Sequence, residues 1–249
     1  VRLASLLQHR RAALVHGPHG VGKTALVREF CAYYGQPGRL FENGVLAVEL
    51  TELALPARPD DLARFVARAL ERHAPVDGGL HERDGFAERT RGAEVQANLV
   101  LALQNWAGRR DGPYLLALDA DRGWWTPDVK RLLGELLGSV QRLRVLLTSP
   151  DEGAKGTEGA EGVGGALGDV KLLALPLADL RPESGALLFA RRAHRALAEA
   201  DFEPGGDASK EPLAMGEVLK RLPGTPLLRQ LGGSPRALRQ AAEAVTPAL

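Results

Sequence analysis

The segment GPHGVGKT at residues 17–24 constrains the fold of this chain more than any other stretch. It fits the pattern GxxxxGK[ST], in which a glycine-rich turn directs successive backbone N–H groups into one concavity that binds phosphate. A short apolar run at 12–16 precedes the turn, and a stretch with helical spacing at 23–34 follows it. Strand, loop and helix in this order form the setting that such a loop requires. We therefore expect an α/β domain with a phosphate-binding loop.

Each residue type in the loop has a chemical role in binding a nucleotide. Gly17, Gly20 and Gly22 permit the tight turn, and the Lys23 ammonium is placed to reach the β- and γ-phosphates during catalysis. The Thr24 hydroxyl is a ligand for Mg²⁺, and the helix that follows offers the positive end of its dipole. The pattern predicts ATP or ADP with Mg²⁺ as cofactors. The expected contact residues of the loop are Gly17, Pro18, His19, Gly20, Val21, Gly22, Lys23, Thr24 and Ala25.

Apolar runs with strand character alternate with helical patterns along the first part of the chain. Short strands that alternate with helices favour a parallel sheet, because right-handed crossovers place helices on both of its faces. We predict an α/β fold with a five-stranded parallel P-loop sheet covered by helices. The predicted strands are 12–16, 45–50, 114–119, 143–148 and 170–175.

The pattern changes in two places, and both changes define the predicted organisation. A glycine-rich, acidic stretch without apolar periodicity at 151–169 predicts a flexible insertion loop. Beyond Pro176 the strand pattern stops, and helical spacing follows. We predict a P-loop domain over 1–178 and a small all-helical domain over 179–249, with helices at 182–200, 213–221 and 235–245.

Polar residues close two of the predicted strands. Asp119 ends the buried run YLLALD in the manner of a Walker B strand, where a carboxylate helps to hold Mg²⁺. Asp121 either activates water or begins the following loop, and the two interpretations have equal weight. Thr148 and Ser149 end the next strand, where a hydroxyl can sense the γ-phosphate or simply cap the chain. We favour the sensor role for both.

Composition narrows the environment and the partners. The 32 basic and 31 acidic residues give a net charge of +1, which provides no field to attract nucleic acid or an anionic membrane. The single cysteine, Cys31, is predicted to be a buried helical thiol, and a chain that cannot form an internal disulfide fits the reducing cytoplasm. No apolar run approaches the roughly 18 residues that span a bilayer. Because the chain begins at Val1 without a methionine, we expect it to be part of a longer protein.

The order of these motifs resembles the STAND class of signalling ATPases, which includes NB-ARC and NACHT domains. GPHGVGKTALV at 17–27 is similar to the family's phosphate loop, YLLALD at 114–119 to its Walker B strand, and RVLLTS at 144–149 to its sensor strand. LGGSPRALRQAA at 231–242 resembles the family's GLPLAL motif. The resemblance implies that Pro235 packs near the adenine and ribose, and that Gly233 allows a close approach.

The resemblance implies a molecular switch in signal transduction. A nucleotide between the sheet and the helical domain would control conformation and homo-oligomerisation through exchange or slow hydrolysis. Effector and sensor domains would lie in the full-length chain.

Two departures from the STAND pattern leave an alternative open. Ala120 stands where many members carry a second acidic residue, and Pro150 stands where many carry an arginine. These residues motivate a scaffold that retains nucleotide with little or no hydrolysis. An AAA+-type ATPase associated with DNA is a third reading, and the balanced charge makes it the least favoured of the three.

Overall fold

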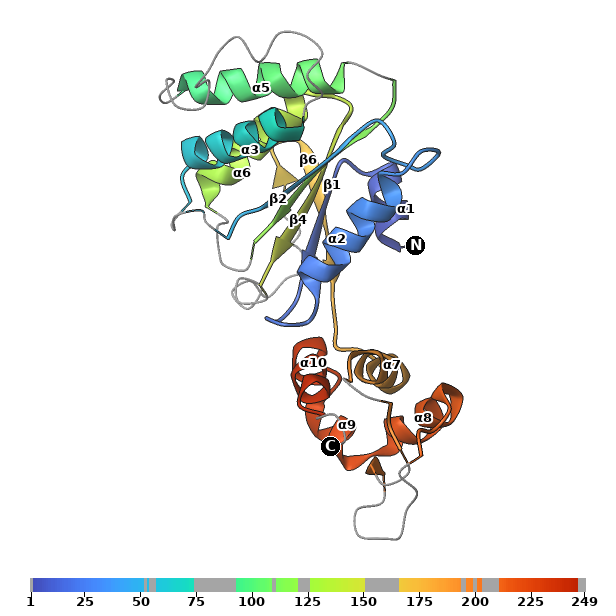
Figure 1. Cartoon of the computed structure of the whole chain (residues 1–249). Helices are drawn as coiled ribbons and strands as arrows, with labels where there is room; N and C mark the ends of the chain where they lie inside the picture. The colour runs from blue at the N-terminus through green and yellow to red at the C-terminus, as the bar shows by residue number, and fades with distance from the viewer. Residues whose placement is uncertain are drawn as a thin grey trace. The chain divides into compact units, whose positions relative to one another are not determined.

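The computed structural model describes residues 2–51, 53, 57–73, 93–108, 111–120, 126–150, 166–193, 196–198, 201–202 and 211–245. By their contacts the residues form two compact units. The first unit consists of Val1–Gly17 and Lys23–Pro176, and it contains the sheet. The second unit consists of Pro18–Gly22 and Leu177–Leu249, and it contains the helices that follow the sheet. Figure 1 shows both units, with labels on many of their helices and strands.

Five parallel strands form the centre of the first unit and confirm the predicted α/β fold. Their order is β2-β3-β4-β1-β6, so β4 lies between the strand that precedes the phosphate loop and the strand that ends in Asp119. Every pairing among these five strands is parallel. Their carboxyl ends therefore lie along one edge of the sheet. The strands are β1 (Ala12–His16), β2 (Val45–Glu49), β3 (Tyr114–Asp119), β4 (Leu143–Ser149) and β6 (Val170–Pro176).

A sixth strand corrects the prediction that 151–169 is entirely a flexible loop. Residues 151–165 lie outside the described part of the chain, but Ala166–Leu167 forms β5 and pairs antiparallel with β6. The Leu167 side chain is buried in the core of the first unit. Burial of this leucine and pairing through a tight turn outweigh the glycine-rich composition, which concealed so short a strand.

Helices cover both faces of the sheet (Figure 1). Three of them, α3 (Pro59–His73), α5 (Ala93–Ala107) and α6 (Pro127–Ser139), bury their apolar residues against one face. The opposite face carries α1 (Arg2–His9) and α2 (Lys23–Tyr34), which contact β1 and the pair β2 and β3 respectively. Within the described residues no helix is long and apolar enough to cross a membrane.

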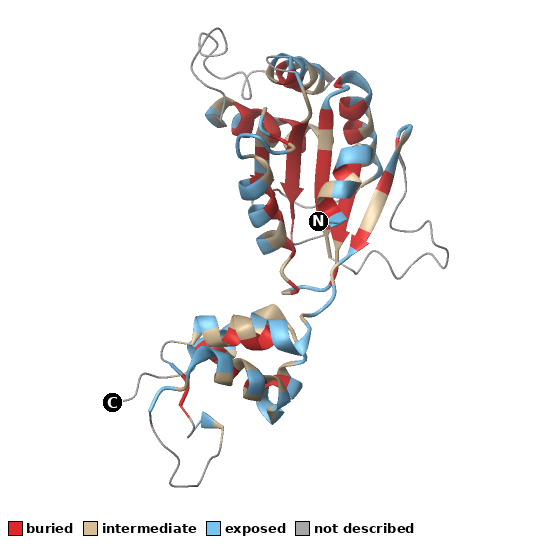
Figure 2. Ribbon diagram, turned by 90° about the vertical axis from the view of Figure 1, so that its right-hand side faces the viewer, coloured by how far each residue is buried: buried red, intermediate tan, exposed pale blue. Residues whose placement is uncertain are grey.

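Alternation along the strands decides which side chains face α2. In β3, Leu116 and Leu118 belong to the core formed with α3, α5 and α6. Leu115 and Ala117 are equally buried but alternate with these residues, so they face the side of the sheet that carries α2. Figure 2 shows that the central strands are buried along most of their length. By the same alternation, Asp119 ends β3 on the α2 side of the sheet.

The helical part of the second unit has its own apolar core. Its elements are α7 (Pro182–Arg192), α8 (Met215–Arg221), the 3₁₀ helix η3 (Leu222–Gly224), α9 (Pro226–Leu231) and α10 (Pro235–Glu243). The prediction of a helix over 182–200 was too long, because α7 ends at Arg192 and Ala198 instead forms a bridge with Pro212. The buried residues of this core are Ala186, Phe189, Leu197, Val218, Leu222, Leu228, Leu238 and Ala242.

Helix α6 approaches β5 so closely at Gly134 that a side chain has no room. A Cβ atom built on Gly134 would lie 2.8 Å from the backbone nitrogen of Gly168 and 2.9 Å from the carbonyl carbon of Leu167. Both neighbours are backbone atoms, so rotation of a side chain cannot relieve the clash. The absence of a side chain at residue 134 thus permits the contact between α6 and β5.

We expect Gly134→Ala to destabilise the chain by about 1–3 kcal/mol, because an added carbon forces backbone shifts in a packed core. Gly138→Ala, in the same helix, is the matched control, since no described atom beyond its chain neighbours and the nearby backbone of α6 lies within 4 Å of its added Cβ. Alanine favours a helix over glycine by up to about 1 kcal/mol, so this control should be neutral or stabilised. Urea unfolding followed by circular dichroism measures both, and equal midpoints would contradict the packing argument.

Candidate functional site

The turn between β1 and α2 has the backbone conformation that the motif requires. Gly20 has φ +86° and Gly22 has φ +98°, a region that other residues rarely adopt. The Val21 backbone N–H donates to the Pro18 carbonyl oxygen at 3.3 Å, which closes the turn. The glycines at these two positions are therefore needed for the shape of the loop itself.

The Lys23 side chain is buried against the start of this loop. Only 5% of Lys23 is exposed, and its Nζ donates to the Gly17 carbonyl oxygen at 2.7 Å. Burying an ammonium group costs free energy unless polar partners compensate for it. Lys23 and Thr24 are also the first two residues of α2, so the positive end of the helix dipole lies at the same place. The loop therefore combines a positive charge with the backbone N–H groups of a helix start, as an anion site does.

The other loop residues differ in their exposure. Pro18, His19 and Ala25 are exposed, whereas Val21 is buried and anchors the turn. The contact of these loop residues with nucleotide stays a prediction. Asp121 lies outside the described residues.

The parallel register brings the predicted polar residues to one edge of the sheet. His16 of β1 is paired with Ser149 of β4, and Asp119 of β3 is paired with Glu49 of β2. Each of these four residues is the last residue of its strand. The phosphate loop follows His16 directly, so it leaves the sheet at the same edge.

A hydrogen bond connects the ends of β3 and β4. The Thr148 hydroxyl donates to Oδ1 of Asp119 at 2.7 Å and accepts from the Ala120 backbone N–H at 2.8 Å. Thr148 is 1% exposed and Asp119 is 8% exposed, so the carboxylate is held in one orientation inside the protein. The neighbouring Ser149 hydroxyl donates to the carbonyl oxygen of Pro150 at 3.2 Å. Of the two predicted sensor residues, Thr148 is thus the one that contacts Asp119.

Glu49 is a residue of this edge that was not predicted from the sequence. The Arg28 guanidinium on α2 donates to Oε1 of Glu49 through Nε at 3.0 Å and through Nη2 at 2.7 Å. The hydrogen bond and charge of Glu49 raise the pKa of Arg28. A signal for Glu49 was present in the sequence, since it is an acidic residue that closes an apolar strand, as Asp119 does.

Cys31 confirms the prediction of a buried helical thiol. It lies on α2, and burial together with the nearby negative charge of Asp119 raises the pKa of its thiol to about 11. Such a thiol is protonated at neutral pH and therefore a poor nucleophile. Within the described residues, no three histidine, cysteine, aspartate or glutamate side chains gather as a metal site.

Gly233 has a structural role inside the second unit. Its φ is +77°, and a Cβ built there would lie 2.3 Å from the Leu180 carbonyl oxygen. The Leu180 backbone N–H in turn donates to the Gly233 carbonyl oxygen at 2.9 Å. Contact with the chain before α7 therefore requires a glycine here, whereas the nucleotide contact that the resemblance implied stays a prediction.

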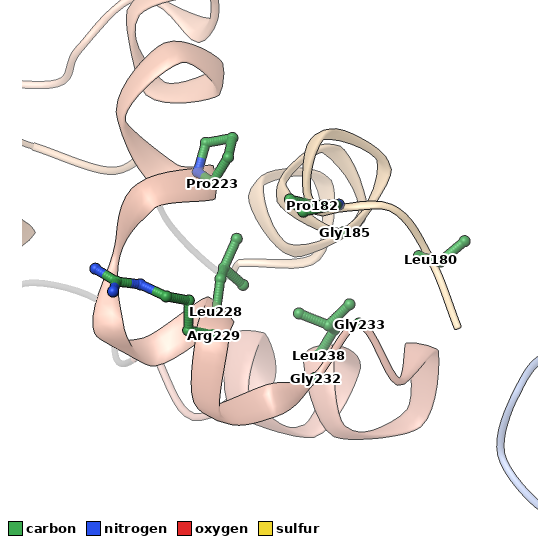
Figure 3. Close-up of a pocket in the computed structure, with 9 residues that line it drawn as sticks. All are labelled: Leu180, Pro182, Gly185, Pro223, Leu228, Arg229, Gly232, Gly233 and Leu238. Atoms are coloured by element: carbon green, nitrogen blue, oxygen red, sulfur yellow. The ribbon is translucent and has the colours of Figure 1, made fainter. Parts of the chain in front are cut away.

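A pocket of about 260 Å³ lies among α7, α9 and α10 (Figure 3). Leu180, Leu228 and Leu238 line it together with prolines and glycines. Among the described lining residues Arg229 is the charged one, and it donates to the Gly224 carbonyl oxygen at 2.8 Å. The described lining is therefore mainly apolar, in contrast to the polar phosphate loop.

The loop residues Pro18–Gly22 belong by their contacts to the second unit, where they meet the start of α10. A Cβ built on Gly20 would lie 2.9 Å from Cβ of Arg236, and one built on Gly22 would lie 3.9 Å from Cγ of Pro235. Pro235 was predicted from the sequence as a nucleotide contact, which stays a prediction, whereas Arg236 was not predicted. A basic residue that directly follows Ser-Pro at a helix start was the available signal.

Comparison with known protein families decides the class of this fold. Residues 2–148 match the AAA ATPase domain family, which is more than half of the chain. The chain belongs to the AAA ATPase domain family. It is therefore a nucleotide-binding P-loop ATPase domain, as the phosphate loop predicted. The match supports this broader class of P-loop ATPases, and the narrower STAND class stays a prediction.

Several solved structures resemble this AAA ATPase domain. Drosophila ORC bound to DNA has 18% identity and a TM-score of 0.47 over 73% of this chain and 41% of that chain. Aeropyrum pernix ORC1 in complex with DNA has 23% identity and a TM-score of 0.44 over 73% and 44%. C. elegans PCH-2 has 13% identity and a TM-score of 0.46 over 96% and 57%. The AAA ATPase domain thus spans less than two thirds of each of these chains, and no curated protein matches its sequence.

We expect Thr148→Val to destabilise this AAA ATPase domain by about 1–3 kcal/mol. Valine has nearly the same shape, but it leaves a carboxylate oxygen of Asp119 and the Ala120 N–H without their buried partner. Ser149→Ala is the control, because among the described residues the Ser149 hydroxyl bonds only to the adjacent Pro150 carbonyl, and we expect a change within about 0.5 kcal/mol. Denaturant unfolding measures the free energy of unfolding of both variants. Equal losses of stability would show that the Thr148 hydrogen bonds contribute no more than the Ser149 bond.

Proposed function

We propose that this AAA ATPase domain binds ATP with Mg²⁺ and acts as a nucleotide-dependent switch. The observation that carries the proposal is the buried Lys23 ammonium inside a glycine turn at the start of α2. In this proposal the loop N–H groups bind the phosphates, and Lys23 contacts the β- and γ-phosphates. Thr24 is a direct ligand of Mg²⁺, and Asp119 holds the outer ligands of the metal.

The contact between Thr148 and Asp119 supports a role for Thr148 in sensing the γ-phosphate. Thr148 holds Asp119 in one orientation. Thr148 lies near the end of β4, which is the strand next to β1. A metal that pulls on Asp119 would change the partner available to the Thr148 hydroxyl. We infer that Thr148, with Ser149 beside it, responds to the γ-phosphate through Asp119.

The loop's membership of the second unit supports the switch. Pro18–Gly22 groups with the helices after the sheet, and Arg236 is the basic residue beside Gly20. LGGSPRALRQAA, which contains Arg236, is also the segment that resembles the STAND class. We infer that nucleotide exchange or slow hydrolysis changes the relation of the two units, and that this change permits assembly with like protomers.

Two other functions remain candidates for specific reasons. Ala120 and Pro150 favour a scaffold that keeps its nucleotide without hydrolysing it. Membership of the AAA ATPase family brings forward an AAA+-type ATPase, for which association with DNA would appear as salt-sensitive binding. Release of inorganic phosphate separates the scaffold from both ATPases.

Lys23→Ala is expected to lower the affinity for MgATP at least tenfold, because it removes the cation that contacts the phosphates. Lys171→Ala is the matched control, since Lys171 is an exposed lysine on β6 and should leave the affinity unchanged. Isothermal titration calorimetry measures both variants against the unaltered chain. Equal affinity of the unaltered chain and Lys23→Ala would refute nucleotide binding at this loop.

The switch predicts that ATP and ADP produce different states of the molecule. Fluorescence transfer between a label on α6 and a label on α8 should differ between the two nucleotides, and light scattering should show a larger mass in one of them. Arg236→Ala should abolish this difference while the helical content is retained. Identical transfer and a monomeric mass with ATP, with ADP and without nucleotide would contradict the switch.

A further inference from the structure

Glu49 lies on the same side of the sheet as Asp119 and α2. In β2, Leu46 and Val48 belong to the core formed with α3, α5 and α6. Side chains alternate along a strand, so Val45, Ala47 and Glu49 face the opposite side. Glu49 is also the register partner of Asp119, which faces that same side. Its bond to Arg28 of α2 agrees with this orientation.

Three polar side chains therefore follow one another across neighbouring strands. Glu49 ends β2, Asp119 ends β3, and Thr148 of β4 bonds to Asp119. Neighbouring strands lie about 4.8 Å apart, so a carboxylate on β2 lies one strand away from the carboxylate assigned to the metal. Glu49 thus stands on the strand beside Asp119 and on the same side of the sheet.

The residue after Asp119 cannot supply a second carboxylate. Ala120 has only a methyl group, which is buried in the core on the other face of the sheet. Its backbone N–H is already bonded to Thr148. In the described part of this edge, the carboxylate next to Asp119 is the one on β2.

The ion pair with Arg28 leaves Glu49 accessible. The side chains of Arg28 and Glu49 are 64% and 48% exposed, and exposed ion pairs contribute little to stability. Glu49 can therefore exchange its partner for a water molecule at low cost. Arg28 belongs to the same helix as Lys23, which places Glu49 beside the helix that begins at the phosphate loop.

We propose that Glu49 is the catalytic residue that orients and deprotonates the attacking water during ATP hydrolysis. The inference rests on the proposed function of the phosphate loop. The water oxygen forms a bond to the γ-phosphorus while the bond from that phosphorus to the bridging oxygen breaks. The electron pair of the broken bond stays with ADP, and the Glu49 carboxylate accepts a proton from the water. Arg28 is an ion-pair partner and takes no part in the reaction.

The test compares Glu49→Gln with Arg28→Gln and Asp121→Asn. Glutamine keeps the size of Glu49 but cannot accept the proton, so we expect kcat for phosphate release to fall by about 10²–10⁴. Affinity for MgATP, measured by calorimetry, should stay within about threefold. Arg28→Gln breaks the same ion pair but leaves the carboxylate, so its turnover should also stay within about threefold. Asp121→Asn tests the other candidate water activator.

Several outcomes would overturn the inference. One is normal turnover in Glu49→Gln, and another is a loss confined to Asp121→Asn. An equal loss of turnover in Arg28→Gln and Glu49→Gln would show that the ion pair has a structural role and that the Glu49 carboxylate does not act as the base. ATP binding without phosphate release in the unaltered chain would reject the catalytic role of Glu49 while nucleotide binding stands. Binding that is indifferent to Lys23→Ala would instead reject the proposed function itself.

Discussion

The parallel register of β2, β3, β4 and β1 is the constraint on which the site depends. Because these strands run in the same direction, their carboxyl ends and the phosphate loop emerge at one edge of the sheet. Glu49, Asp119 and Thr148 are 99 residues apart at most in the chain, and register alone brings them to adjacent strands. A slip of one residue would turn Asp119 to the other face, into the core formed with α3, α5 and α6. The apolar alternation that packs the core therefore also orients the site.

Burial strengthens the electrostatic effect of the charged groups at this site. Lys23 and Asp119 are both almost fully enclosed, and each has a polar partner, the Gly17 carbonyl and the Thr148 hydroxyl. Charges in a low-dielectric environment act more strongly on a ligand than charges in water, and orientation in advance reduces the cost of binding. Glu49 and Arg28 differ from this pair because they are exposed and can exchange partners. The edge therefore combines fixed charges for binding with one adaptable carboxylate.

The sequence predicted the strands of this fold well, but it did not predict which residues lie beside one another in space. Apolar runs located the five parallel strands, and the spacing of the motif located Lys23 and Asp119, because these signals are local. Glu49 was missed because its importance depends on which strand lies beside β3, and strand order is not a local property. The short β5 and the early end of α7 depend on burial and pairing that composition does not report. Gly233 was recognised as significant, but its close neighbour is the Leu180 carbonyl inside the helical unit.

The central claim is that the loop at 17–24 and the edge formed by β2, β3 and β4 form one site for ATP and Mg²⁺. A crystal structure of the chain with Mg²⁺ and a non-hydrolysable ATP analogue tests this claim most directly. We predict the β- and γ-phosphates on the loop N–H groups and Lys23, with the metal on the Thr24 hydroxyl and its water ligands on Asp119. A nucleotide bound elsewhere, or a metal that is remote from both Thr24 and Asp119, would contradict it.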